Sequence, residues 1–208
     1  MAHYVMHNGE VLQRHQENLE LIRRVLDKHY VELQLVTLRV EENAEETKTS
    51  ATLQLSDGKQ TLSLEGCGVG LVDAVFHALL DHYGSEYQSL NSIELADFKV
   101  EAKIETKHAK VGVDSLGTVR LDVHNSEGKS FEFSDESRSV SRSAARAVIA
   151  AVEYFVNAER AFITLHRALL DAKERKRVDL ITRYTQELAE VVKSTSFTEV
   201  IEKMKKDL

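Results

Sequence analysis

The stretch from Asp57 to Tyr83 constrains the fold of this 208-residue chain more than any other. It opens with Asp57-Gly58-Lys59, which favours a hairpin turn because Asp and Gly both tolerate positive φ. Gln60 to Glu65 alternates leucines with polar residues, as a half-buried strand does. Gly66 to Gly70 places glycines at alternate positions, and Leu71 to Tyr83 repeats apolar residues at helical spacing. The stretch therefore predicts a strand that enters a helix through a corner of exposed backbone amides.

Both ends of this helix carry a signal. Gly84 follows Tyr83, where a left-handed C-terminal cap is common. Asp73 lies in the first turn, where the helix dipole favours an acidic residue, and where a carboxylate could equally hold a ligand ammonium group. The glycine corner likewise fits a ligand cradle or a plain tight turn, so both pairs of interpretations stay open.

The chain repeats this arrangement. Thr52 to Leu55, the Asp57-Gly58-Lys59 turn, a strand and a helix are matched about 70 residues later by Val119 to Val123, Glu127-Gly128-Lys129, a strand and a helix that begins near Ser139. The repeat predicts two strand-strand-strand-helix (βββα) units related by a pseudo-twofold axis.

Alternating apolar residues predict the other strands. Between Val31 and Val40 the alternation changes phase, which predicts a bulge or two short strands. Glu41 to Lys48 has no large apolar residue and predicts a solvated loop. Phe98 to Ile104 predicts a strand with one buried and one wet face, which favours an antiparallel sheet. Val111 to Val113 predicts a short strand before a turn at Asp114 to Gly117.

Helices are predicted at both ends of the chain. Residues 8–30 place apolar side chains on one helical face. After Ser139, heptad-like spacing favours a helical hairpin or a seam with a partner. The charge-rich Lys173 to Arg177 predicts a link to a further helix over Leu180 to Val191, and a capping box at Ser196 to Glu199 predicts a short last helix.

The predicted fold class is α+β, with two pseudo-repeated βββα units, antiparallel sheets, an N-terminal helix and a C-terminal helical extension.

Composition excludes several classes of partner. The formal net charge of −7 argues against nucleic acid, because nucleic-acid binders concentrate Lys and Arg. No apolar run approaches the roughly 20 residues that cross a bilayer, so we expect no membrane segment. The single cysteine, Cys67, cannot form an internal disulfide, which agrees with a reducing compartment. We therefore expect a cytoplasmic protein.

Four short motifs occur in order over residues 31–157. They are Leu35 to Val40, Gly68-Val69-Gly70-Leu71-Val72-Asp73-Ala74, Gly112 to Val119, and Ser143 to Ala147. With these motifs the chain resembles the C-terminal regulatory domain of α-isopropylmalate synthase and its relatives, citramalate and homocitrate synthases. The family patterns at the last three places are Gly-x-Gly-Pro-Val-Asp-Ala, Gly-x-Asp-Ala-x-Gly-Glu-Val and Ala-Ser-Ala-x-Ala.

The resemblance implies two βββα units that form a homodimer and bind a feedback amino acid, leucine in the namesake enzymes, with no cofactor. The effector is expected near the glycine corners and the helix starts. Free amides at a helix N-terminus suit its carboxylate. The resemblance implies that Asp114 lines this site, although Asp114 also fits a plain turn. The residues carried over as effector-binding are Gly68, Gly70, Val72, Asp73, Ala74, Asp114 and Gly117.

The chain departs from the family in three places. The motif proline is Leu71. The second corner falls in Asp135-Glu136-Ser137 and has no glycine, and Ser139 to Ala144 lacks the family's acidic residue. These changes preserve the fold and count against leucine binding at that half. On the resemblance we expect an N-terminal helix over residues 1–30, a regulatory-type domain over 31–158 with repeats at about 31–84 and 91–158, and a helical extension over 159–208.

A catalytic centre is not predicted. Family synthases carry a metal-dependent barrel with a His-x-His ligand pair, and the nine histidines here include no such pair. His77 and His82 fall on different helical faces, so no metal site is predicted. The sequence predicts a stand-alone regulatory domain, not an enzyme, that binds leucine or a related amino acid or 2-oxo acid and acts on a separate catalytic subunit. The alternative is a dimerisation scaffold with a decayed pocket, whose helical ends recruit a partner.

Overall fold

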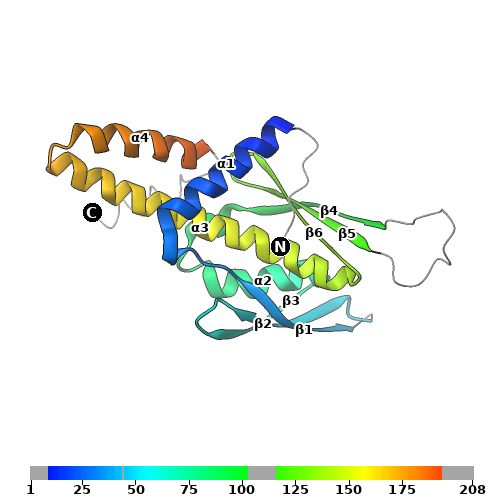
Figure 1. Ribbon diagram of the computed structural model, residues 1–208. Coiled ribbons are helices and arrows are strands. Elements are labelled where there is room, and N and C mark those ends of the chain that lie inside the picture. Colours follow the sequence, from blue (N-terminus) through cyan, green and yellow to red (C-terminus); the bar gives the residue numbers. More distant parts are fainter. Residues whose placement is uncertain (1–8, 44, 103–115, 194–208) are drawn as a thin grey trace.

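The computed structural model describes residues 9–43, 45–102 and 116–193 (Figure 1). The strand at Val111 to Val113, the site residue Asp114 and the helix at Ser196 lie outside these residues. The elements are α1 (Gly9–Leu26), the 3₁₀ helix η1 (Asp27–His29), β1 (Gln34–Asn43), β2 (Lys48–Ser56), β3 (Thr61–Gly68), α2 (Leu71–Tyr83), the 3₁₀ helix η2 (Gln88–Ser92), β4 (Glu94–Ala102), β5 (Gly117–His124), β6 (Ser130–Ser137), α3 (Val140–Glu174) and α4 (Val178–Lys193).

The two predicted βββα units are present. Each has a three-stranded antiparallel sheet, in the orders β1-β2-β3 and β4-β5-β6. The predicted turn glycines Gly58 and Gly128 have φ of 81° and 73°. The predicted bulge in the first strand is a register shift between Leu35 and Thr37, and β4 has the same shift between Leu95 and Asp97. The repeat therefore extends to this local irregularity, and the α+β prediction is confirmed.

The helices α2 and α3 lie between the two sheets (Figure 1). α2 packs on β2 and β3, α3 packs on β5 and β6, and the two helices contact each other. Leu53 and Leu55 of β2 are fully buried in the first unit. In the second unit the ring of Phe131 lies 5.7 Å from that of Tyr154 and 5.2 Å from that of Phe155. The core is thus a layered sheet-helix-helix-sheet arrangement.

The last helices form the hairpin that the heptad spacing favoured. α3 continues unbroken to Glu174, and α4 folds back on it beyond the predicted link (Figure 1). α3 also runs through residue 158, so the domain boundary expected there stays a proposal. α1 packs on α3 and α4, and the Arg24 guanidinium lies 3.1 Å from the Glu187 carboxylate. Among the helices of the described residues, none has the length and apolar composition to cross a bilayer.

The prediction that β4 has one buried and one wet face is wrong. Phe98 is 40% and Val100 46% exposed, although both belong to the apolar side of the alternation. The physical reason is that α3 packs on β5 and on the opposite edge strand β6, so it leaves β4 largely uncovered. Alternation identifies the strand but not whether a helix covers it.

Two predicted ends of elements are also wrong. Residues 41–43 are not a loop, because Glu41, Glu42 and Asn43 pair with β2 as exposed residues of β1. Gly84 has φ of −66°, so it is not a left-handed cap. A Cβ at Gly84 would lie 2.6 Å from the Leu80 carbonyl oxygen, so close packing is the reason for glycine there.

Two polar side chains of α3 hold the segment before β1. Asn157 accepts a hydrogen bond from the Val31 N–H (2.9 Å) and donates one to the Val31 carbonyl (2.8 Å). Glu153 accepts from the Leu33 N–H (2.9 Å) and from the Tyr30 hydroxyl (3.1 Å). Val31 and Leu33, predicted as strand residues, therefore precede β1 and bond to α3 instead. These contacts fix where β1 begins.

A third side chain of α3 holds the segment before β4. The buried Glu159 carboxylate accepts hydrogen bonds from the N–H groups of Gln88 (3.2 Å) and Ser89 (2.9 Å), and from the Ser89 hydroxyl (2.7 Å). These residues form η2, which leads into β4. The same helix therefore positions the first strand of both units.

Replacing Asn157 with alanine tests this arrangement. Asn157 is 1% exposed, and its loss leaves the Val31 N–H and carbonyl without these partners. We expect the free energy of unfolding in urea to fall by about 1–3 kcal/mol. Thr164→Ala is the matched control, since Thr164 is exposed on the same helix and bonds only the Arg160 carbonyl. Its expected change is within about 0.5 kcal/mol, and equal effects of both variants would contradict the anchoring role.

The pH dependence of stability tests Glu153. Burial raises the pKa of this carboxyl, and the hydrogen bonds from Leu33 and Tyr30 oppose that shift only in part. Between the unfolded and folded pKa the native state binds more protons, so the free energy of unfolding falls as pH rises through this window. Glu153→Gln removes this titration and keeps an oxygen acceptor. We expect the variant to gain stability relative to wild type from pH 4.5 upward, as measured by urea unfolding at successive pH values. Parallel pH profiles would refute this.

Candidate functional site

The start of α2 is tighter than the sequence predicts. Gly66 and Gly68 are not in a corner, because they are residues of β3 and pair with Ala51 and Thr49 of β2. Only Val69 and Gly70 link the strand to the helix. Most of the expected exposed amides therefore belong to the sheet.

Two of these glycines are required by close packing. A Cβ at Gly66 would lie 2.5 Å from the Ala78 nitrogen, and a Cβ at Gly68 would lie 2.6 Å from the Ala74 nitrogen. At Gly70 a Cβ would meet nothing within 4 Å. The glycines of β3 thus allow α2 to lie directly on the strand, whereas Gly70 has open space above it.

The Asp73 side chain closes the link between β3 and α2. Its Oδ2 accepts a hydrogen bond from the Val69 N–H (3.0 Å), and its Oδ1 lies 3.6 Å from His77 Nε2. His77 Nδ1 in turn lies 2.8 Å from the Cys67 carbonyl oxygen. The carboxylate is 40% exposed, so it stabilises the corner and still faces solvent on one side.

The predicted effector residues divide between the two helix starts. Gly68, Asp73 and Ala74 are brought together, and Ala74 is fully buried. Gly70 is the N-cap of α2, and Val72 in its first turn packs against the core. Gly117 begins β5, and a Cβ there would lie 3.5 Å from Val140 at the start of α3. Asp114 lies outside the described residues.

The start of α3 replaces glycine with a polar network. Asp135 precedes its N-cap, Ser139, by the same interval as Gly66 precedes Gly70. The Ser143 hydroxyl donates a hydrogen bond to Asp135 Oδ2 (2.8 Å) and lies 2.8 Å from the Ser137 hydroxyl. Ser139 Oγ accepts from the Arg142 N–H (3.3 Å). Hydrogen bonds between β6 and α3 therefore take the place of the backbone contact made in the first unit.

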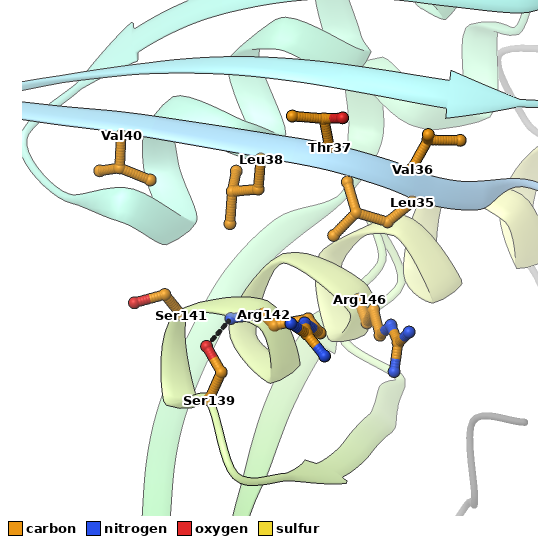
Figure 2. A pocket seen from close by; sticks show the side chains of 9 residues that line it. All are labelled: Leu35, Val36, Thr37, Leu38, Val40, Ser139, Ser141, Arg142 and Arg146. Carbon is orange, nitrogen blue, oxygen red and sulfur yellow. Dashed lines mark hydrogen bonds between the residues drawn. The ribbon is translucent and has the colours of Figure 1, made fainter.

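An open groove of about 690 Å³ lies between β1 and the first turns of α3. Figure 2 shows β1 on one side, with Leu35, Leu38 and Val40 extending toward the start of α3, where Ser139, Ser141, Arg142 and Arg146 lie. The lining residues are Leu35, Val36, Thr37, Leu38, Val40, Ser139, Ser141, Arg142 and Arg146. The groove thus has mainly aliphatic side chains on its β1 side and hydroxyl and guanidinium groups on its α3 side, and more of its accessible surface is polar than apolar.

The two arginines have different surroundings. Arg146 Nη1 lies 3.9 Å from Oδ1 of Asp135, whose side chain is 6% exposed. The Arg142 side chain has no hydrogen bond or ion pair within the part of the chain that the structure describes. One guanidinium is therefore loosely paired and the other is available to an anion.

Arg142, Arg146 and the β1 residues were not predicted as site residues. A signal existed, since Arg142 is the third residue of α3 just as Asp73 is the third residue of α2. Arg146 likewise matches His77 one turn later. The position of β1 could not be predicted from the sequence, because it depends on contacts between α3 and residues more than 100 positions away.

One comparison with known proteins finds a family. A model of the family described as LeuA allosteric (dimerisation) domain matches residues 15–156. That range includes both sheets, α2 and the first half of α3. No curated protein matches the chain.

Alanine substitutions at two glycines test the packing of the α2 start. Gly66→Ala inserts a Cβ against the backbone of α2, and we expect the free energy of unfolding in urea to fall by about 1–3 kcal/mol. Gly70→Ala is the matched control, because its Cβ has open space and its φ of −152° suits any residue. Its expected change is smaller, below about 1 kcal/mol, which is the cost of alanine in place of glycine at an N-cap. A tolerated Gly66→Ala would contradict the close approach of α2 to β3.

Proposed function

The chain belongs to the LeuA allosteric (dimerisation) domain family, and on this premise we propose that it is a homodimeric regulatory domain that binds a small effector. The effector class is leucine or a related amino acid or 2-oxo acid. The regulated enzyme is a separate synthase of branched-chain amino acid biosynthesis. Both the division of the chain at residues 30 and 158 and the effector role of Asp114 belong to this proposal.

Self-association is supported by apolar residues on the outer strands. Val36 of β1 is 60% exposed, and Phe98 and Val100 of β4 are also exposed. Outer strands with exposed apolar side chains are a liability for a monomer, because they invite pairing with another chain. A second copy over these strands would remove that surface from water, in agreement with a family named for dimerisation.

The observation that carries effector binding is the groove at the start of α3. It lies at a helix start, where the family resemblance expects the effector, and its volume suits a small organic molecule. The start of α2 is the second part of the proposed site, with Gly68, Gly70, Val72, Asp73 and Ala74. There the exposed side of the Asp73 carboxylate could accept a ligand ammonium group.

A specific observation favours a second candidate, the dimerisation scaffold. Asp73 already accepts a hydrogen bond from Val69, and α2 occupies the space above the two β3 glycines. The first corner therefore has little free hydrogen-bonding capacity. At the other end of the molecule Val178, the first residue of α4, is exposed. A scaffold would use the α3–α4 hairpin to contact its partner.

Light scattering and thermal unfolding together test the proposal. We expect a particle of twice the 23.5 kDa chain mass. We also expect a selective rise in the unfolding temperature with one of leucine, isoleucine, valine or their 2-oxo acids. An effector at 100 times its Kd stabilises by about 2.7 kcal/mol, which corresponds to about 5–11 °C for a chain of this size.

The other outcomes separate the two candidates. A dimer whose unfolding temperature does not change with any of these compounds supports the scaffold. A monomer without a ligand response contradicts both.

A further inference from the structure

The two helix starts carry opposite charges. Asp73 and His77 lie one turn apart on α2, and Arg142 and Arg146 occupy the same two positions on α3. Residues four apart on a helix share one face, so each start presents its pair together. The pseudo-symmetric fold therefore contains one acidic start and one basic start, which suit different ligands.

The lining of the groove beside the basic start has an excess of positive charge. None of its nine residues is acidic. The buried Asp135 carboxylate behind the groove offsets one arginine, through its contact with Arg146. The Arg142 guanidinium remains, on the same wall of the groove as Ser139 and Ser141. The balance of the site is close to a single positive charge, which a monoanion would neutralise.

The β1 side of the groove indicates what the part of the ligand beyond its anionic group should be. Leu35, Leu38 and Val40 of β1 present branched aliphatic side chains across from the arginines (Figure 2). A carboxylate would receive charge-assisted hydrogen bonds from the guanidinium groups, and a branched alkyl tail would lie against β1. An α-ammonium group would lie beside two cations without a carboxylate in the lining to accept its hydrogen bonds.

We propose that the groove between β1 and α3 binds a branched aliphatic monocarboxylate without an α-ammonium group, such as a 2-oxo acid. Arg142 and Arg146 hold the carboxylate, and Leu35 and Leu38 contact the tail. This inference rests on the proposed effector-binding function and selects the chemical class of the effector.

Calorimetric titration of the full chain with four probes of one carbon skeleton tests the selection. The probes are 4-methyl-2-oxopentanoate, 4-methylpentanoate, leucine and 4-methylpentan-1-ol. We expect both carboxylates to bind, and leucine and the alcohol to bind at least about tenfold more weakly, since tenfold corresponds to the loss of one charge-assisted hydrogen bond.

Arginine variants locate the binding. Arg142→Gln with Arg146→Gln should weaken carboxylate binding by at least about tenfold. Arg39→Gln with Arg167→Gln is the matched control, because it removes the same charge from β1 and α3 outside the groove and should leave binding unchanged. Arg142→Lys with Arg146→Lys keeps the charge and should restore part of the affinity. Thermal unfolding of each variant separates loss of binding from loss of folding.

Three results would overturn the inference while the proposed function survives. Tighter binding of leucine that only Asp73→Asn weakens would place the effector at the acidic start. Equal binding of the alcohol would show that the arginines do not select the ligand. Carboxylates that fail to bind a dimer, with the double glutamine variant dissociating that dimer, would make the groove an interface between copies. A monomer that binds no probe would overturn the inference and the proposed function together.

Discussion

Three polar side chains on α3, two of them buried and one half-buried, determine where both sheets begin. Glu153 and Asn157 bond the backbone before β1, and Glu159 bonds the backbone before β4. β1 and β4 are outer strands, and each unit's own helix packs mainly on the other two strands of its sheet. Their positions therefore depend on directional hydrogen bonds more than on apolar burial. Because β1 forms one wall of the groove, the shape of the candidate site depends on the same contacts.

The two units connect strand to helix in different ways. In the first, Gly66 and Gly68 allow α2 to contact the strand directly. In the second, Asp135 and Ser143 join β6 to α3 by a hydrogen bond. Asp135 also partly neutralises Arg146, so the residue that replaces glycine is part of the charge balance beside the groove. Loss of the glycine motif in the second unit has thus changed the chemistry of the site without disturbing the βββα fold.

Local signals predicted most of the fold. The turn glycines, the first bulge, the repeat and the helical hairpin each depend on residues close in sequence. Contacts between distant residues were not predictable, such as the bonds that join Val31 to Asn157 across 126 residues. The exposure of Phe98 was missed for the same reason, since it depends on which strands α3 covers. The packing role of Gly84 was missed although its neighbour Leu80 is local, because a glycine after a helix fits a left-handed cap and a close contact equally well. At the site, spacing located both helix starts, but only the folded chain places Arg142 opposite β1.

The length of α3 has a mechanical consequence. With 35 residues the helix is about 50 Å long, and the side chains of Glu153, Asn157 and Glu159 lie near its middle. The groove is at one end, and the turn into α4 is at the other (Figure 1). Those three side chains join the helix to the segments before β1 and β4, and buried residues from Ser143 to Ala172 pack it along its length. If this helix tilted as a rigid rod by about 2° around its middle, each end would move by roughly 1 Å in opposite directions, so a single unbroken element couples the geometry of the groove to that of the distant hairpin.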